Sequence, residues 1–326
     1  MFEIGLRIRK WWSNIKLRKN KENTAQQVHE TRISLMVLGF SLKLFGLVLF
    51  ALVILFPFFF MVMISLMPKE QSDLLKTSFS LIPKEWVWKN FVTAASTSNS
   101  GTKYGDAFVL TFINVLFSIV VKTFITMLGG YAFSLKNWKF KNVIWSFFIA
   151  LLVLPEVALL SGQYRVISIL NNTTHINNYF TGMVTIISLP FIASIFSALM
   201  FRNAFSAIPN RLKEVATVDG AVGAKYFFKI AVPMISPTTL TVVILTALAS
   251  WNSYLWPSLV SNGNFQVLSL WLFSVGKEEI DGSEYLLQSV KMAGALLAIA
   301  PMFGFYLLFR KRIMASISRQ GSTIKG

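Results

Sequence analysis

The stretch IPNRLKEVATVDGAVGAKYFFKIAVP, residues 208–233, has mixed polarity and lies between long apolar runs. Pro209 fits the first turn of a helix, where its missing N–H costs nothing, and apolar residues follow it at helical spacing. Asp219 and Gly220 form a turn pair that can end this helix, and Pro233 can end or kink a second one. The stretch therefore predicts a helix-turn-helix loop between two membrane spans.

The composition of the chain indicates a membrane protein. It has 326 residues, of which 54% are hydrophobic, with 30 Phe and a mean hydropathy of +0.59. This is too apolar for an ordinary soluble domain. The net charge of +17 comes from basic residues in short segments beside the apolar runs, which argues for membrane topology and against nucleic-acid binding. With no Cys and only two, distant His residues, no thiol chemistry and no metal site is predicted.

The predicted fold class is all-α, a polytopic membrane protein with six transmembrane helices and a cytoplasmic helix-turn-helix loop. Between the first two spans, the sequence LIPKEWVWKNF at 81–91 has aromatic and turn residues that predict a packed cap on the outer face. The expected domains are a basic arm (1–33), the six-helix domain (34–309) and a C-terminal tail (310–326). The six spans are expected at about residues 38–67, 108–135, 143–160, 183–205, 235–256 and 290–309.

Charge is distributed asymmetrically between the two sets of loops. The N-terminal arm, the turn at 136–141, the loop at 202–235 and the tail carry most of the Lys and Arg residues, whereas acidic residues are concentrated in the opposite loops. This is the positive-inside pattern. It places the loop at 208–233 and both termini in the cytoplasm, in a multi-pass protein of the cell membrane.

Within the opening stretch, Glu214, Ala216, Gly220, Ile230 and Pro233 follow a known spacing. They resemble the coupling-loop signature of permease subunits in ATP-binding-cassette (ABC) importers, which reads Glu-Ala-Ala, three residues, Gly, nine residues and Ile-x-Leu-Pro. Two positions depart from it by carrying Val. The Ile-Pro lead-in and the Asp-Gly-Ala turn are similar to the carbohydrate-importing branch, the maltose and oligosaccharide permeases. The resemblance implies that the residues contacting an ATPase are Leu212, Glu214, Val215, Ala216, Asp219, Gly220, Ile230 and Pro233.

The resemblance also implies partners. They are a homologous second permease, two ATPase subunits that bind ATP and magnesium, an extracytoplasmic solute-binding protein, the lipid bilayer and a small-molecule sugar. No cofactor is expected in this chain, because it lacks the phosphate-binding loop Gly-x4-Gly-Lys-Ser/Thr. The chain is not expected to be an enzyme, since its spans contain no paired carboxylates and no Ser-His-Asp set.

Lys122 lies near the middle of the second predicted span, where a charge is costly and is a functional hypothesis by default. Its alternative role is a structural one, in a water-filled cavity or in an ion pair. Trp251, Asn252 and Tyr254, at the outer end of the fifth span, resemble an element of carbohydrate importers. Aromatic faces beside an amide suit a sugar, although an interfacial aromatic belt is the alternative. These four residues form the predicted substrate path.

The C-terminal sequence RQGSTIKG, residues 319–326, is either a flexible basic terminus or a partner contact. It resembles the Gly-Leu-Thr…Val-Lys-Gly terminus of one permease subunit of oligosaccharide importers, with shorter spacing. That terminus reaches into the ATPase, which implies contacts from Gln320, Gly321 and Lys325. The basic N-terminal arm has two alternatives as well, an orientation anchor or a partner-binding arm.

Two other functions remain open on the sequence. The first is a permease of the same architecture that carries a different solute, such as a polyol, a glycerophosphodiester or a peptide. The second is an unrelated channel or secondary transporter, which leaves the coupling signature unexplained. The residues do not identify the sugar, because specificity depends largely on the binding protein.

Overall fold

The structure is a computed structural model that describes residues 11–12, 33–75, 77–96, 101–135, 138–261, 265–280 and 283–322. It divides into two compact units, Met1–Phe58 and Phe59–Gly326. Apart from Trp11, Trp12 and Ile33, the predicted N-terminal arm lies outside the described residues.

The first unit contains most of helix α2 (Ile33–Ser65), which is uninterrupted although Pro57 lies inside it. Its apolar side chains are exposed, and Phe40, Phe45 and Phe50 each expose about two thirds of their surface at 67%, 69% and 67%. A helix that is apolar on all sides suits a lipid environment, where the backbone satisfies its own hydrogen bonds.

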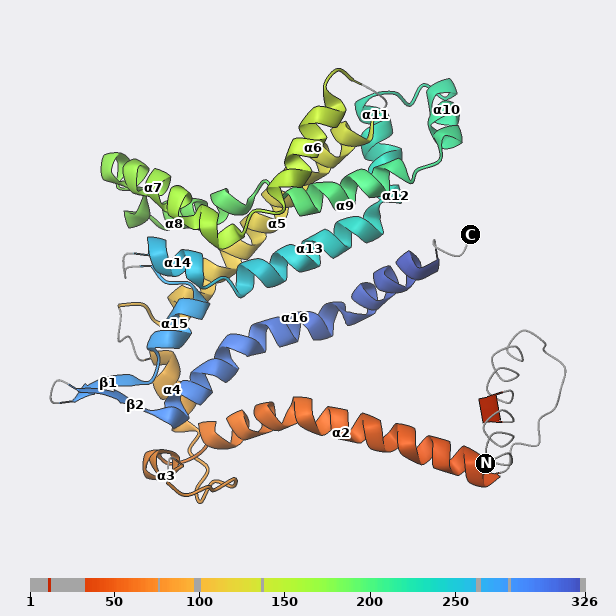
Figure 1. Cartoon of the computed structure of the whole chain (residues 1–326). Coiled ribbons are helices and arrows are strands. Elements are labelled where there is room, and N and C mark those ends of the chain that lie inside the picture. Colours follow the sequence, from red (N-terminus) through yellow and green to blue (C-terminus); the bar gives the residue numbers. More distant parts are fainter. Residues whose placement is uncertain are drawn as a thin grey trace, which may run out of the picture. The chain divides into compact units, whose positions relative to one another are not determined.

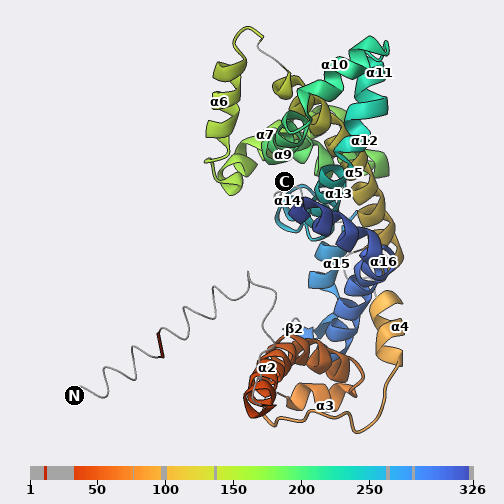
Figure 2. The ribbon, with the colours of Figure 1, turned by 90° about the vertical axis from the view of Figure 1, so that its right-hand side faces the viewer.

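The second unit is built on helix α5 (Tyr104–Ser134), which packs against α9 (Ile195–Ser206) and α13 (Ser236–Trp251) (Figure 1). A glycine permits the closest approach to α9. A Cβ added to Gly130 would lie 2.5 Å from the Cβ of Phe201 and 2.8 Å from the carbonyl oxygen of Ala198. Figure 2 shows the short helices α10 and α11 together at one end of this unit. The remaining helices are α3 (Lys69–Leu74), α4 (Lys89–Ser96), α6 (Lys141–Leu151), α7 (Glu156–Thr174), α8 (Phe180–Ser188), α10 (Asn210–Val218), α11 (Ala224–Tyr226), α12 (Val232–Met234), α14 (Leu255–Val260), α15 (Leu268–Ser274) and α16 (Gln288–Ser322), with 3₁₀ turns η1 (Ile176–Asn178) and η2 (Leu189–Phe191) and a π-helix η3 (Phe227–Ala231).

By length and composition, three of the described helices can cross a membrane: Val37–Ser65, Tyr104–Ser134 and Gln288–Lys311. The number rises to five if two bent pairs each count as one span. These pairs, Phe180–Phe191 with Ile195–Ser206 and Ala224–Met234 with Ser236–Trp251, are bent by 62° and 74°. The protein is therefore a polytopic helical membrane protein.

The third predicted span, residues 143–160, is not one helix. Helix α6 ends at Leu151 and α7 starts at Glu156. Pro155 lacks an N–H and disfavours helical backbone in the residue before it, and here it precedes the first residue of α7. The helix that contains the predicted sixth span is longer than that span, because α16 continues through residues 310–322.

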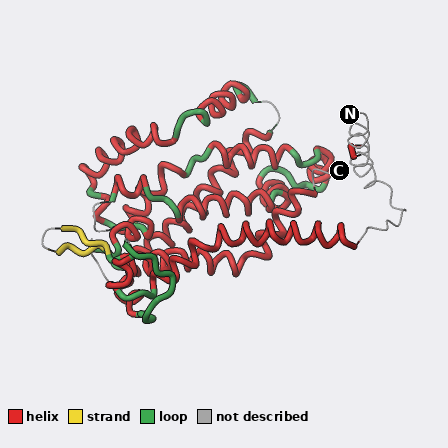
Figure 3. The backbone as a smooth tube through the Cα atoms, turned by 60° about the horizontal axis from the view of Figure 1, so that its bottom comes forward, coloured by secondary structure: helices red, strands yellow, loops and turns green. Residues whose placement is uncertain are grey.

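Strands also depart from the all-α expectation. Lys277–Ile280 (β1) and Ser283–Leu286 (β2) form an antiparallel hairpin, the only sheet in the part of the chain that is described (Figure 3). Its strand β1 carries Glu278, which forms an ion pair at 3.7 Å with Lys69 of α3.

Two side chains hold the segment that follows α2 by hydrogen bonds, although Trp86 and Trp88, on which the predicted cap rests, expose 56% and 66% of their surface. The amide Nδ2 of Asn90 donates to the carbonyl oxygens of Ser65 and Met67, both at 2.9 Å, and is buried. Gln71 of α3 holds the chain at residues 82–84. Its Nε2 donates to Ile82 O at 2.8 Å, and its Oε1 accepts from the N–H of Lys84 at 2.8 Å. The bonds from Asn90 satisfy the carbonyl group of Ser65, the last residue of α2, and that of Met67 just after it.

A tyrosine compensates for the proline inside α16. Pro301 has no N–H, so the carbonyl of Leu297, four residues earlier, loses its helical donor. The hydroxyl of Tyr104 donates to that carbonyl at 3.0 Å. The first turn of α5 is thereby linked to the middle of α16.

Candidate functional site

The loop at 208–233 consists of helix α10, a turn at Gly220, the short helices α11 and α12, and the π-helix η3 between them. Helix α10 ends in a Schellman turn, in which the N–H of Ala221 donates to Ala216 O at 2.8 Å and the N–H of Gly220 donates to Thr217 O at 3.1 Å. Gly220 has a φ of 68°, the left-handed conformation that this turn requires. An added Cβ there would meet no atom within 4 Å of this chain. Glycine is therefore favoured at this position by its backbone conformation and not by lack of space.

The second half of the loop starts at another glycine with positive φ. Gly223 has φ 57° and ψ −128° and precedes α11. The chain then continues through the π-helix η3 and α12, which contains Pro233. π-Helical segments are rare and often occur at functional sites. This one leads directly into the 74° bend before α13.

One face of the loop is buried against the ends of α5 and α9. Ala216 is 4% exposed, and Ile230 is half-buried at the edge of the same core. This packing fixes α10 on the body of the unit. The buried members of the core are Met127, Phe201, Phe205, Ala216, Tyr226, Phe227, Ala231, Ile235 and Val242.

The opposite face of α10 is apolar and exposed. Leu212, Val215 and Val218 expose 41%, 52% and 87% of their surface and recur at intervals of three residues, so they form one stripe. Glu214 and Asp219 are exposed, and neither forms an ion pair with another described residue. Pro233 and Gly220 are exposed as well. Val218 was not among the predicted contact residues, although its helical spacing from Val215 was a signal for it.

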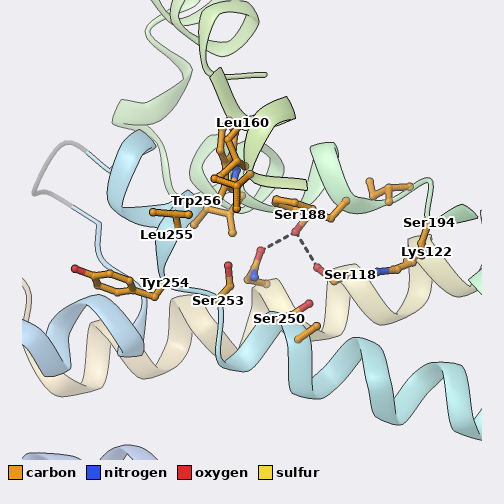
Figure 4. Close-up of a pocket in the computed structure, with 16 residues that line it drawn as sticks. Ser118, Lys122, Leu160, Ser188, Ser194, Ser250, Ser253, Tyr254, Leu255 and Trp256 are labelled. Atoms are coloured by element: carbon orange, nitrogen blue, oxygen red, sulfur yellow. Dashed lines mark hydrogen bonds between the residues drawn. The ribbon is translucent and has the colours of Figure 1, made fainter. Parts of the chain in front are cut away.

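A cavity of about 460 Å³ lies between α5, α7, α8 and the segment from α13 to α14 (Figure 4). Three buried polar side chains are linked in it. The hydroxyl of Ser188 donates to Asn114 Oδ1 at 2.6 Å, and the hydroxyl of Ser118 donates to the Ser188 oxygen at 3.1 Å. Lys122 also lines the cavity, and its amino end lies beside Ser118 in Figure 4. The cavity is therefore rich in hydroxyl, amide and ammonium groups.

Helix α5 contributes its polar groups to this cavity in a regular pattern. Asn114, Ser118 and Lys122 recur every four residues and so lie on one face of the helix. This polar stripe in an apolar segment was the sequence signal for Asn114 and Ser118, which sequence reasoning missed. Ser188 could not be found in this way, because its connection to α5 is a tertiary one.

The structure brings only part of the predicted substrate path together. Lys122 and Tyr254 line the cavity, whereas Trp251 and Asn252 do not. The Trp251 ring packs edge-on against Phe108 at 6.3 Å between centroids. Asn252 is exposed, and its Nδ2 donates to Leu248 O at 2.9 Å.

Trp256 is the aromatic residue that the prediction left out. It lines the cavity, is 2% exposed and donates from Nε1 to Ile186 O at 3.1 Å. Of the predicted tail contacts, Gln320 and Gly321 lie in the last turns of α16, and Lys325 lies outside the described residues. No cluster of three or more His, Asp or Glu side chains suited to a metal is found among the described residues.

Comparison with known proteins agrees with these features. Residues 125–319 match the family described as "Binding-protein-dependent transport system inner membrane component". The chain is 40% identical to the probable ABC transporter permease protein MG189 homolog of Mycoplasma pneumoniae, over 97% of this chain and 98% of the relative. It is 26% identical to AraQ of Bacillus subtilis, an arabinooligosaccharides transport system permease, over 88% of this chain and 95% of the relative.

Two further proteins are similar over most of their length. UgpE of Yersinia pestis, a sn-glycerol-3-phosphate transport system permease, is 26% identical over 66% of this chain and 74% of its own. A bacterial ABC transporter involved in the import of the acidic polysaccharide alginate has the same fold, with a TM-score of 0.66 at 16% identity, covering 87% of this chain and 99% of that one. With a matching family segment that covers more than half of the residues, the chain belongs to the inner-membrane permease components of binding-protein-dependent ABC importers.

Proposed function

We propose that this permease imports a sugar or oligosaccharide delivered by an extracytoplasmic binding protein. The observation that carries the proposal is the cavity at Asn114, Ser118 and Ser188, whose lining combines hydroxyl and amide groups with the aromatic residues Tyr254 and Trp256. A sugar offers apolar C–H faces for aromatic rings and a rim of hydroxyls for polar groups. AraQ, whose name gives arabinooligosaccharides as its cargo, is a relative over nearly the full length.

Permease subunits of this family are not catalytic, and ATP hydrolysis belongs to a separate subunit. Family membership also implies a substrate-binding protein and in general a second permease. We infer that the complete assembly holds this chain, one homologous permease, two ATPase subunits and the binding protein. In it, the apolar stripe of α10 (Leu212, Val215 and Val218) enters a groove of the ATPase, with Glu214 and Asp219 beside it.

Closure of the ATPase subunits on ATP would then move α10 as a rigid body. Because Ala216, Tyr226 and Phe227 share one core with the ends of α5 and α9, displacement of α10 is transmitted to those helices. Ile230 and Pro233 complete this connection toward α13. The tail at Gln320, Gly321 and Lys325 provides a second contact to the ATPase.

The proposed topology has six membrane crossings, with both termini and the loop at 208–233 in the cytoplasm of a multi-pass plasma-membrane protein. It consists of the arm 1–33, the membrane domain 34–309 and the tail 310–326. The charge asymmetry of the loops supports it. A third crossing would combine α6 with part of α7 across the break at residues 152–155.

A second candidate cargo is a phosphorylated polyol. The ammonium group of Lys122 at the cavity favours an anionic group on the solute, and UgpE is named for sn-glycerol-3-phosphate. The deciding experiment is uptake into proteoliposomes that contain the whole importer and its cognate binding protein, with radiolabelled oligosaccharides in one set and sn-glycerol-3-phosphate in another. ATP-dependent uptake of the phosphate ester alone would overturn the sugar proposal.

A further inference from the structure

A second, smaller cavity lies beneath α10, on the side away from the apolar stripe. It measures about 130 Å³, well below the roughly 300 Å³ at which pockets for small organic molecules begin. It therefore suits a small ion better than a sugar. Its walls come from the end of α5, the end of α9, the start of α10 and the residues around α11, namely Tyr131, Ser134, Leu135, Phe205, Ser206, Ile208, Asn210, Lys213, Tyr226 and Ala231.

Every polar side chain that lines this cavity can donate a hydrogen bond. Lys213 contributes an ammonium, Tyr131 and Tyr226 contribute hydroxyls, and Asn210 contributes an amide. Ser206 adds a further hydroxyl, and no carboxylate belongs to the lining. A site with many donors and one positive charge favours an anion.

The start of α10 strengthens this preference. Asn210, its first residue, lines the cavity, and no side chain caps the helix at Pro209. The N–H groups of Asn210 and Arg211 have no acceptor among the described residues, while that of Leu212 donates to Pro209 O at 3.0 Å. Free N–H groups at a helix N-terminus, together with the helix dipole, attract anions.

Tyr226 is an independent sign of a ligand. It lines the cavity and is only 7% exposed, so more than nine tenths of it is buried. Its hydroxyl forms no hydrogen bond with another described residue and is not among the fully buried unpaired atoms, so it is accessible to a group in the cavity. A group bound in the cavity would supply the missing acceptor.

We propose that this cavity binds one small oxyanion, either inorganic phosphate or the phosphate of an anionic lipid headgroup. The anion accepts hydrogen bonds from Tyr226, from the N-terminus of α10 and from the ammonium of Lys213. It thereby joins α10 to the ends of α5 and α9 on the face opposite the apolar stripe. This site is separate from the sugar path, and the proposal does not depend on the identity of the imported solute.

The test uses the full chain, without ATPase subunits, in lipid nanodiscs. Equilibrium binding of ³²P-orthophosphate is measured in phosphatidylcholine discs, and retention of phosphatidylglycerol is measured by native mass spectrometry from mixed discs. Lys213→Met and Tyr226→Phe each remove one donor. Each should weaken binding about tenfold, the effect expected for a hydrogen bond to a charged group. Lys225→Met and Tyr306→Phe are matched controls, because both residues are exposed and neither lines the cavity.

Saturable phosphate binding that the two cavity variants weaken supports a soluble anion. Retention of one phosphatidylglycerol per chain with the same dependence supports a lipid headgroup. The proposal is overturned if the wild-type chain binds neither, or if the cavity variants bind as well as the controls do. Monodisperse elution of every variant from size-exclusion chromatography shows that a loss is not caused by unfolding.

Discussion

Gly220 is the residue on which the geometry of the proposed coupling loop depends most directly. Its φ of 68° costs an ordinary L-residue roughly 1–2 kcal/mol, and a β-branched residue more. We expect Gly220→Val to leave the chain inserted, because the site has room for a Cβ, and to abolish sugar uptake because the turn no longer presents α10 correctly. ATP hydrolysis and uptake in proteoliposomes are the measurements.

Gly220→Asn is the matched control for this turn, since Asn tolerates the left-handed conformation better than Val does. It should retain a large part of the uptake. Equal activity in both variants would show that the turn is not needed for coupling.

Lys122 tests the larger cavity. We expect Lys122→Met to depress uptake at least tenfold while the importer still assembles, because the change removes a charge at the cavity and keeps most of the side-chain volume. Lys103→Met, at the N-terminal boundary of α5 and outside the cavity, is the control. Unchanged uptake kinetics in Lys122→Met would assign the lysine a structural role.

At the level of elements, the apolar stripe of α10 is expected to carry the ATPase contact. Val218 is 87% exposed, so Val218→Asp should cost this chain little stability. In a desolvated contact the same charge costs a few kcal/mol, which corresponds to a loss of binding of about a hundredfold or more. The loss of binding is measured by the amount of ATPase that co-purifies with the permease.

Glu214→Arg should act in the same direction, if Glu214 faces a basic partner in the ATPase. Thr217→Asp is a suitable comparison, because Thr217 is exposed on α10 but lies outside the apolar stripe. Normal co-purification of both Val218→Asp and Glu214→Arg would leave α10 without its proposed role.

The contact between α5 and α16 offers a separate test. Tyr104→Phe removes the donor to Leu297 O and should destabilise the protein by about 1–2 kcal/mol. In a Pro301→Ala background the backbone N–H at 301 can serve Leu297, so the same change should cost less. A double-mutant cycle from denaturant unfolding in detergent measures the difference. Equal costs in both backgrounds would contradict the role of Tyr104 as the replacement donor for Leu297.

At the scale of the whole molecule, the long helices and the turn at Gly220 could be predicted from the sequence because both depend on local signals. The apolar runs at α2, α5 and α16 and the turn at Gly220 are examples. The break before Pro155 was also visible as a proline, but the apolar residues on both sides of it suggested one continuous span. The bonds of Ser188 to Asn114 and Ser118 join residues more than 60 positions apart, so no local pattern contains them.

The topology is the last prediction. Reporter fusions at residue 326 and within 202–235 should report the cytoplasm, whereas fusions near residues 95 and 265 should report the outside. The physical reason is the excess of basic residues in the first set of segments. The opposite pattern would refute the proposed orientation, and with it the access of α10 to the ATP pool.

The Schellman turn at Gly220 also bears on how fast and at what entropic cost the subunits assemble. The turn is held by its own two hydrogen bonds and by the packing of Ala216, so α10 is ordered before any partner arrives. Ordering a disordered loop on docking costs about 1–2 kcal/mol per residue in backbone entropy. A preorganised loop avoids this cost, so most of the contact energy remains as affinity and no slow folding step precedes association.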